Sequence, residues 1–348
     1  MLRLEDHWVW DSWIADDGDL YHLFFLMAPR SLVDPGTRHT AATVGHATSR
    51  DLVTWDYLGE CFGPAETGFD DLAIWTGSVV RDGDRWRMFY TAVSTSGHHV
   101  YDQRVGSAVS DDLHHWSRVS SEPAVRVDGR WYKNLANTPA PTEGPDLEGS
   151  SETWRDPLVF ADADGDGWHL LLAARARDAA RNDDGVVAHA TSPDLEHWTL
   201  QPPLCEPGAG FGQLEVLQDK QIDGRWVLVF TCHPQEMTAE RKARTGEYCT
   251  WSVPGEGPLG PWDIDAAQPF EAEPHLFAAP LVQRRDGSWA LVGFRNVEPE
   301  GFDGFEIIDP IPVTLDADGY LVATDDYAPH PSSYARLATA EKTAGESA

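Results

Sequence analysis

One pattern of apolar and polar positions recurs along the chain. It consists of an apolar run, an Asp-Gly turn, a Trp or Tyr, and a second apolar run. Asp-Gly between two strand-like runs is a strong hairpin signal, and it favours a type I′ turn in which both central residues have positive φ. Each copy therefore predicts two antiparallel strands. The five turns are Asp17-Gly18, Asp82-Gly83, Asp164 to Gly167, Asp223-Gly224 and Asp286-Gly287.

A second signal, Ser-x-Asp-Leu-x-x-Trp, follows the hairpin in the first three copies. It spans Ser49 to Trp55, Ser110 to Trp116 and Ser192 to Trp198, and the fourth copy keeps a looser form, Gly260-Pro261-Trp262. In the first three copies an alternating strand precedes the signal, and each Trp begins a further, outer strand. Each unit is thus expected to be a four-stranded antiparallel meander, which must stack on its neighbours to bury its faces.

Five such units arranged radially give an all-β fold, a five-bladed β-propeller. We expect one propeller domain over residues 1–330 and a flexible tail over residues 331–348. Helix signals are few, with a short helix expected between Met237 and Glu247. Two long polar loops rich in Pro and Gly, Arg30 to His39 and Val125 to Thr153, are candidates for a functional role because of their length.

Charge and composition exclude several classes of protein. The 57 acidic and 26 basic residues give a formal charge of −31, which argues against nucleic acid or an anionic membrane as partner. Solubility or a salt-rich cytosol explains this charge more simply than attraction of a cationic ligand. No apolar run reaches the roughly 18 residues of a membrane span, and the N-terminus lacks the pattern of a signal peptide. We therefore expect a cytoplasmic protein.

The four cysteines are expected to be free thiols. Cys61, Cys205, Cys232 and Cys249 show neither C-x-x-C spacing nor a zinc pattern, which fits a reducing compartment. The run Asp162-x-Asp164-x-Asp166 resembles the start of a calcium loop, but it coincides with a required hairpin turn and Ala173 stands where Glu would be needed. No metal site is predicted, and we read the pairs His98-His99 and His114-His115, with His275, as surface or packing residues.

The repeat predicts that polar and charged side chains meet near the propeller axis, because the first strand of each blade lines this axis. Alignment on the turns puts Asp11, Trp75, Asp156, Glu215 and His275 at or near the starts of the five first strands. Taken singly, each acid has an ordinary structural explanation. Asp11 could cap the start of a strand, Asp156 could belong to a surface ion pair, and Glu215 could lie on a solvent-exposed strand face. Three carboxylates that share one cavity raise each other's pKa, so the arrangement predicts a functional site.

The motifs at these positions resemble those of two glycoside hydrolase families, 68 (levansucrases, inulosucrases) and 32 (invertases). Val9-Trp10-Asp11-Ser12-Trp13 resembles the nucleophile motif of family 68, and Tyr21-His22-Leu23-Phe24 resembles the following strand in invertases. Trp75-Thr76-Gly77-Ser78 and Arg155-Asp156-Pro157 are similar to stretches found in both families. The resemblance covers roughly residues 5–325, and its specificity comes from the combination and order of the motifs.

The resemblance implies a retaining glycosidase that acts on β-fructofuranosides such as sucrose or short fructo-oligosaccharides. Asp11 would be the nucleophile, Glu215 the acid/base with a raised pKa, and Asp156 an ionised stabiliser of the transition state. Trp10 and Trp75 would form the walls of the sugar-binding site. Ser78 and Arg155 would hydrogen-bond the sugar. No metal or organic cofactor would be needed, and the partner would be a small saccharide.

The sequence also departs from both families. Glu215-Val216-Leu217 replaces the Glu-Cys-Pro of family 32 and the Glu-Arg-Pro of family 68, the invertase Asn-Asp-Pro is absent, and the chain leaves no room for the β-sandwich that follows the propeller in family 32. Two alternatives stay open, a family 43-like arabinofuranosidase or xylosidase and a non-catalytic sugar-binding propeller. The sequence leaves the acceptor, the linkage and the oligomeric state open.

Overall fold

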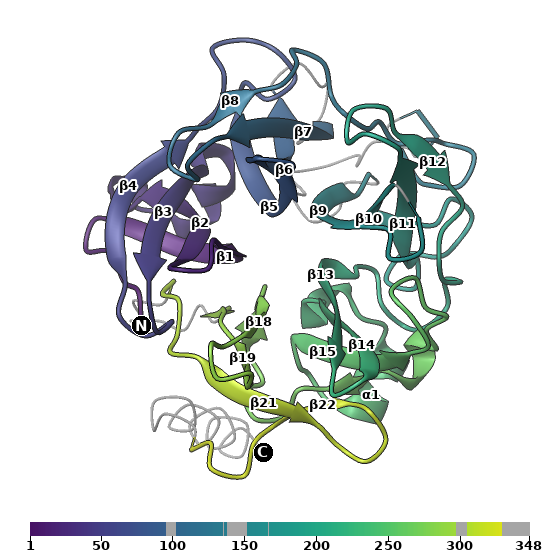
Figure 1. Ribbon diagram of the computed structural model, residues 1–348. Helices are drawn as coiled ribbons and strands as arrows, with labels where there is room; N and C mark the ends of the chain where they lie inside the picture. Colours follow the sequence, from purple (N-terminus) through teal and green to yellow (C-terminus); the bar gives the residue numbers. More distant parts are fainter. Residues whose placement is uncertain (95–101, 135, 138–151, 166, 297–304, 329–348) are drawn as a thin grey trace.

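The computed structural model describes residues 1–94, 102–134, 136–137, 152–165, 167–296 and 305–328. Five four-stranded antiparallel sheets follow one another around a central axis, as Figure 1 shows. The predicted all-β, five-bladed propeller is therefore confirmed. The tail expected over residues 331–348 lies outside the described residues, as do His98-His99 and most of the second half of the long loop that ends at Thr153.

The blades take their strands in chain order, from the axis outward. The first two contain β1 (His7–Asp16), β2 (Tyr21–Pro29), β3 (Thr43–Ser49), β4 (Asp56–Phe62), β5 (Ala73–Asp82), β6 (Arg85–Ser94), β7 (Asp102–Ser110) and β8 (Ser117–Arg118). The next two contain β9 (Trp154–Ala161), β10 (Trp168–Arg175), β11 (Gly185–Ser192), β12 (Thr199–Gln201), β13 (Glu215–Ile222), β14 (Arg225–Thr231), β15 (Thr250–Gly255) and β16 (Gln268–Pro269).

The fifth blade is less regular than the repeat predicted. Its sheet is β18 (Leu281–Gln283), β19 (Trp289–Leu291), β21 (Ile311–Leu315) and β22 (Leu321–Ala323), with a separate pair of β17 (Leu276–Phe277) and β20 (Phe294–Arg295). The repeat predicts one strand before the Asp286-Gly287 turn, over the apolar run from Leu276 to Val282. It is split because Ala278 has φ 45° and Pro280 supplies no ladder N–H. Leu2 pairs with Ile307 beside this blade, which joins the two ends of the ring.

The Ser-x-Asp-Leu-x-x-Trp signal forms the same turn in three blades. In the first blade the Ser49 hydroxyl accepts hydrogen bonds from the backbone N–H groups of Asp51 and Leu52. The side chain of Asp51 accepts from the next two N–H groups. The central residues Leu52, Leu113 and Leu195 all have φ near 64° and are buried. The local polar side chains thus stabilise a left-handed conformation that a buried leucine rarely adopts.

The Asp-Gly hairpins are less uniform. Asp223 and Gly224 both have positive φ, 49° and 79°, as a type I′ turn requires. In the first, second and fifth blades only the glycine does, at 98°, 59° and 88°. The hairpins form as predicted, but the type I′ geometry holds for one of these four.

Irregular segments lie outside the sheets. The loop after β2 contains two 3₁₀ helices, η1 (Arg30–Leu32) and η2 (Pro35–Ala41). Another loop holds η3 (Pro234–Glu236) and α1 (Ala239–Thr245), which is the short helix expected between Met237 and Glu247, and η4 (Ile264–Ala266) follows β15. Among the described residues, no helix is long and apolar enough to cross a membrane.

Candidate active site

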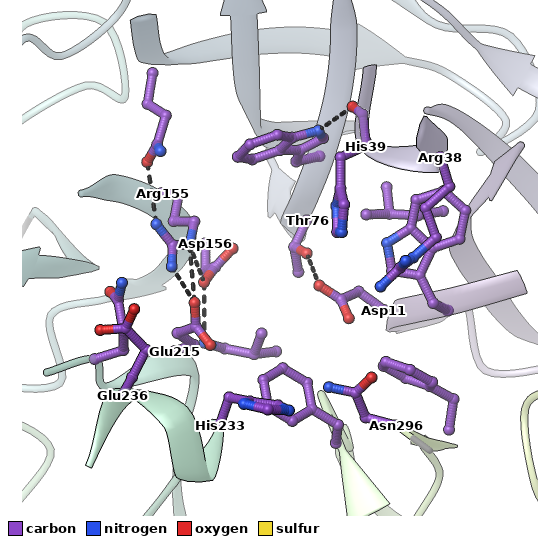
Figure 2. A pocket seen from close by; sticks show the side chains of 18 of the residues that line it. Asp11, Arg38, His39, Thr76, Arg155, Asp156, Glu215, His233, Glu236 and Asn296 are labelled. Atoms are coloured by element: carbon purple, nitrogen blue, oxygen red, sulfur yellow. Dashed lines mark hydrogen bonds and ion pairs between the residues drawn. The ribbon is translucent and has the colours of Figure 1, made fainter. Parts of the chain in front are cut away.

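A cavity of about 320 Å³ lies where the five inner strands converge. Asp11 on β1, Asp156 on β9 and Glu215 on β13 all line it. The structure therefore brings together the three carboxylates that the sequence predicted, although they are far apart in the chain (Figure 2).

Irregularities in the inner strands turn these side chains toward the cavity. The ladder register shifts between Val9 and Ser12 in β1, opposite Leu171 to Ala173 in β9, and between Glu215 and Gln218 in β13. Asp156 has φ 57°, and its backbone N–H donates to the Thr91 hydroxyl at 2.9 Å. β-Bulges and positive φ values in non-glycine residues concentrate at functional sites, where they aim a side chain.

Asp11 is held by a threonine that the sequence analysis did not single out. The Thr76 hydroxyl donates to Asp11 Oδ2 at 2.7 Å. Burial raises the pKa of Asp11 to about 6, the hydrogen bond from Thr76 opposes this shift, and the nearby charge of Glu215 adds to it. The Thr76 hydrogen bond favours the ionised carboxylate, which is the form a nucleophile needs.

Arg155 connects the other two acids. Its Nε donates to Glu215 Oε1 at 3.1 Å, its Nη2 makes a second bond to the same oxygen, and Nε lies 3.7 Å from Asp156 Oδ2. On its other side, Nη1 reaches the side-chain oxygen of Gln103 at 3.4 Å. The guanidinium is thus committed more to Glu215 than to Asp156.

The surroundings of Asp156 oppose the ionised state that the resemblance implies. Burial raises the pKa of Asp156 to about 8, and the charges of Glu215 and Asp11 add to the rise, while Arg155 opposes it. These surroundings therefore favour a proton on the cluster at neutral pH. Since the charges of Glu215 and Asp11 both act on Asp156, this proton belongs to the cluster as a whole.

The two predicted tryptophan walls line the cavity. Trp10 is buried, and Trp75 donates from Nε1 to the backbone oxygen of His39 at 2.8 Å. Arg38 and His39, both from η2, line the same cavity, and the Arg38 guanidinium lies 5.7 Å from the Trp10 ring centroid. The sequence predicted a functional role only for the long polar loop from Arg30 to His39 as a whole, and it did not identify these two residues.

Ser78 is the predicted residue that the structure places elsewhere. It lines a second cavity, farther along the inner strands, and its hydroxyl accepts from the Val159 N–H at 3.1 Å. The register shift between Trp75 and Gly77 is the reason, because it turns Thr76 toward the acids. A Cβ on Gly77 would lie 2.2 Å from the Phe89 oxygen, so the bulge needs glycine there.

Blades four and five add residues that the sequence analysis missed. Glu236, at the end of η3, lines the cavity, and its carboxylate accepts from Arg175 at 2.9 Å. His233 and Asn296 line it as well, whereas His275, expected at the fifth spoke, is not among the lining residues. No motif identified these positions, because loops between strands bring them to the axis.

Within the described residues, no group of three or more His, Cys, Asp or Glu side chains is arranged to hold a metal ion. The four cysteines are free. Asp11, Asp156 and Glu215 can supply acid–base and nucleophilic chemistry, in a cavity of a size that accepts a small molecule.

Known proteins resemble this chain in sequence and fold. A levanase of Bacillus subtilis is 30% identical over 232 residues, which cover 62% of this chain and 29% of the levanase. A sucrose-6-phosphate hydrolase of Zymomonas mobilis is 25% identical over 340 residues, covering 90% of this chain and 59% of the hydrolase. The chain spans about a third of the length of the curated yeast invertases that it matches.

The fold is shared with solved structures. An inulosucrase from Halalkalicoccus jeotgali, bound to kestose, superposes with a TM-score of 0.73 at 20% identity, covering 95% of this chain and 92% of that one. The family model for the glycosyl hydrolases family 32 N-terminal domain matches residues 13–257, well over half of the chain. By this match the chain belongs to the family 32 glycosyl hydrolases.

Proposed function

We propose that this chain is a retaining glycosidase that acts on β-fructofuranosides, such as sucrose or short fructo-oligosaccharides. The observation that carries the proposal is the meeting of Asp11, Asp156 and Glu215 in one cavity, with Arg155 between two of them. Membership of the family and the names of the relatives, which include levanase and invertase, support the substrate class.

In this mechanism Asp11 attacks the anomeric carbon of the fructosyl unit, and the bond to the leaving oxygen breaks. Glu215 gives its proton to that oxygen, and the fructosyl group stays bound as an ester of Asp11. Glu215, now a carboxylate, then takes a proton from water or from a sugar hydroxyl, whose oxygen displaces Asp11. Two displacements at one carbon retain its configuration. A retaining reaction requires about 5–5.5 Å between the two carboxyl groups.

Asp156 would hold fructose hydroxyls and Arg155 would orient Glu215. The proton that the cluster keeps at neutral pH supplies the acid required in the first step. Arg155 donates a hydrogen bond to Glu215. Substrate binding therefore has to weaken this contact, or move the shared proton onto Glu215, before Glu215 can protonate the leaving oxygen. Trp10 and Trp75 would give the sugar its apolar walls, as the resemblance implied.

An uncharged fructoside fits the cavity better than a phosphorylated one, although a relative is named a sucrose-6-phosphate hydrolase. Four carboxyl groups line the described part of the cavity, those of Asp11, Asp156, Glu215 and Glu236, and with one proton on the cluster three of them are negatively charged. The described lining contains two arginines and no lysine. This charge balance opposes a dianionic phosphate.

The test compares wild type with Asp11→Asn and Glu215→Gln on sucrose, a fructo-oligosaccharide and a nitrophenyl arabinofuranoside. Each variant should lose at least about 10³-fold of the wild-type activity on fructosides. Asp16→Asn is a matched control, because Asp16 is the last residue of β1, five residues after Asp11, and pairs with Arg285 at the surface.

Released fructose should appear first as the β-furanose anomer by NMR. The α anomer would exclude retention. A wild-type protein that cleaves the arabinoside and no fructoside would overturn the proposed substrate class.

A further inference from the structure

One side chain in the cavity has no part in the mechanism above. His39 is carried by η2, whose start is fixed by Asp34, since the Asp34 side chain accepts from the Gly36 N–H at 2.9 Å. At the other end of the segment, Trp75 Nε1 donates to the His39 backbone oxygen at 2.8 Å. The backbone of His39 is therefore held to the wall of the active site by a hydrogen bond from one of its tryptophans.

The His39 ring is packed between aromatic neighbours. Its centroid lies 6.1 Å from that of Trp10 and 6.0 Å from that of Trp75, and both contacts are edge-to-face. Burial lowers the pKa of His39 to about 3, and the cations Arg38 and Arg155 reinforce this shift. The imidazole is consequently neutral near pH 7, with one nitrogen as hydrogen-bond donor and the other as acceptor.

The ring nitrogens make no hydrogen bond within the described part of the chain. Figure 2 shows the imidazole pointing into the cavity, between Thr76 and Arg38 and on the side of Asp11. The ring is partly buried and lines the cavity, so a ligand that supplies a hydrogen-bond partner gains affinity. A neutral donor–acceptor pair suits a hydroxyl group.

We propose that His39 is a substrate-binding residue that hydrogen-bonds a hydroxyl of the sugar held beside Asp11. This inference rests on the proposed function and assigns to η2 a role in sugar recognition. A hydroxyl both donates and accepts, so either ring nitrogen can engage it. The fixed orientation between two indoles limits which hydroxyl can be reached, and His39 thereby contributes to sugar specificity.

The experiment measures sucrose binding by calorimetry in the inactive Asp11→Asn protein, alone and combined with His39→Phe, His39→Gln or Thr40→Ala. Phenylalanine keeps the aromatic contacts with both indoles and removes the hydrogen bond. Glutamine keeps a neutral donor and acceptor. Thr40 is the matched control, since it lies in η2 next to His39, is exposed and does not line the cavity.

We expect His39→Phe to raise the dissociation constant for sucrose roughly tenfold or more. His39→Gln should recover part of this loss, and Thr40→Ala should change nothing. In the otherwise wild-type enzyme, His39→Phe should lower kcat/KM for sucrose by a similar factor while the unfolding temperature stays within a few degrees.

A second measurement keeps the proposal testable if His39→Phe folds poorly. The imidazole ¹⁵N signals of Asp11→Asn protein, assigned with His39→Gln, should shift when sucrose is added and keep the pattern of a neutral ring.

Two results would overturn the role of His39 and leave the proposed function standing. One is an equal sucrose affinity of the Asp11→Asn protein with and without His39→Phe, and the other is a set of His39 signals that stay unshifted at saturating sucrose. Failure of wild type to cleave any fructoside, together with failure of Asp11→Asn to bind one, would overturn both proposals.

Discussion

Asp11 lies in surroundings that disfavour its charge, although the proposed reaction needs that charge. Burial raises the pKa of Asp11 to about 6 and that of Asp156 to about 8. A hydrogen bond from Thr76 and the charge of Arg38 lower the pKa of Asp11 again. At neutral pH these opposing effects leave an ionised nucleophile beside a cluster that still holds one proton.

The pH dependence of fructoside cleavage should therefore be bell-shaped. Activity rises as Asp11 loses its proton near pH 6, and it falls as the cluster loses the shared proton near pH 8. The measurement is kcat/KM for sucrose between about pH 4.5 and 9.5. A rate that is flat from about pH 5 to 9 would contradict the assignment of these two groups.

Removal of the Thr76 hydroxyl should move the acid limb. Thr76→Val takes away the 2.7 Å hydrogen bond to Asp11, so the pKa of Asp11 should rise and the acid limb should shift to higher pH. We expect the loss of kcat/KM to be several-fold greater at about pH 5.5 than at about pH 7.5. Thr40→Val, in η2 and outside the cavity, should give the wild-type profile.

At the scale of the strands, the propeller repeats a hydrogen-bonded histidine pair in two blades. His22 on β2 and His46 on β3 are joined by a 3.0 Å hydrogen bond, as are His169 on β10 and His189 on β11. The two pairs stand at matching ladder positions, since His22 faces Thr48 and His169 faces Thr191. The sequence analysis did not single out this repeat.

Three of these four histidines, His22, His46 and His189, resist protonation in the folded protein. Burial lowers the pKa of His46 to about 3 and that of His189 to about 4, and it also lowers the pKa of His22. Around His22 and His46, the charges of Asp17, Asp16 and Asp112 oppose the shift, while that of His114 adds to it. The carboxylates are too few to offset burial.

Acid should consequently destabilise the propeller through these histidines. Below about pH 6.5 a histidine in the unfolded chain takes up a proton, whereas His46 in the folded protein stays neutral. The free energy of unfolding therefore falls as pH decreases. The slope is about 1.4 kcal/mol per pH unit for each such histidine. The double variant His22→Leu with His46→Leu should show a shallower slope than wild type between about pH 6.5 and 4.5 in urea unfolding.

The control for this experiment is His115→Leu, because the His115 side chain is 89% exposed. Its slope should equal that of wild type. An unchanged slope in the double variant would show that other groups dominate the acid response.

At the scale of the whole molecule, a formal charge of −31 surrounds a cavity lined by four acidic side chains. Such a field slows the approach of anions and leaves neutral sugars unaffected. Salt shortens the range of the field to about 10 Å at 0.1 M.

The salt concentration should therefore change kcat/KM differently for a neutral and for a phosphorylated substrate. Raising NaCl from about 10 mM to about 0.5 M should increase kcat/KM for sucrose 6-phosphate several-fold and change that for sucrose by less than about twofold. The ratio of sucrose to sucrose 6-phosphate should exceed about ten at the low concentration. A preference for the phosphate ester there would contradict the charge argument.

The sequence by itself determined the architecture and the chemical identity of the three acids. Repeated turns and alternating apolar runs depend on local backbone preferences, which the sequence encodes within a few residues, so the blades and their order could be predicted. Asp11, Asp156 and Glu215 followed from their equivalent places in that repeat, and all three line the cavity.

Only the tertiary structure decided which neighbours these acids have. Thr76 and Ser78 belong to one short motif, yet a one-residue register shift turns Thr76 to Asp11 and leaves Ser78 in another cavity. Arg38, His39 and Glu236 come from irregular loops with no repeating pattern, and their place depends on long-range packing around the ring. The raised pKa of Asp156 has the same origin, because burial and neighbouring charge are properties of the folded chain.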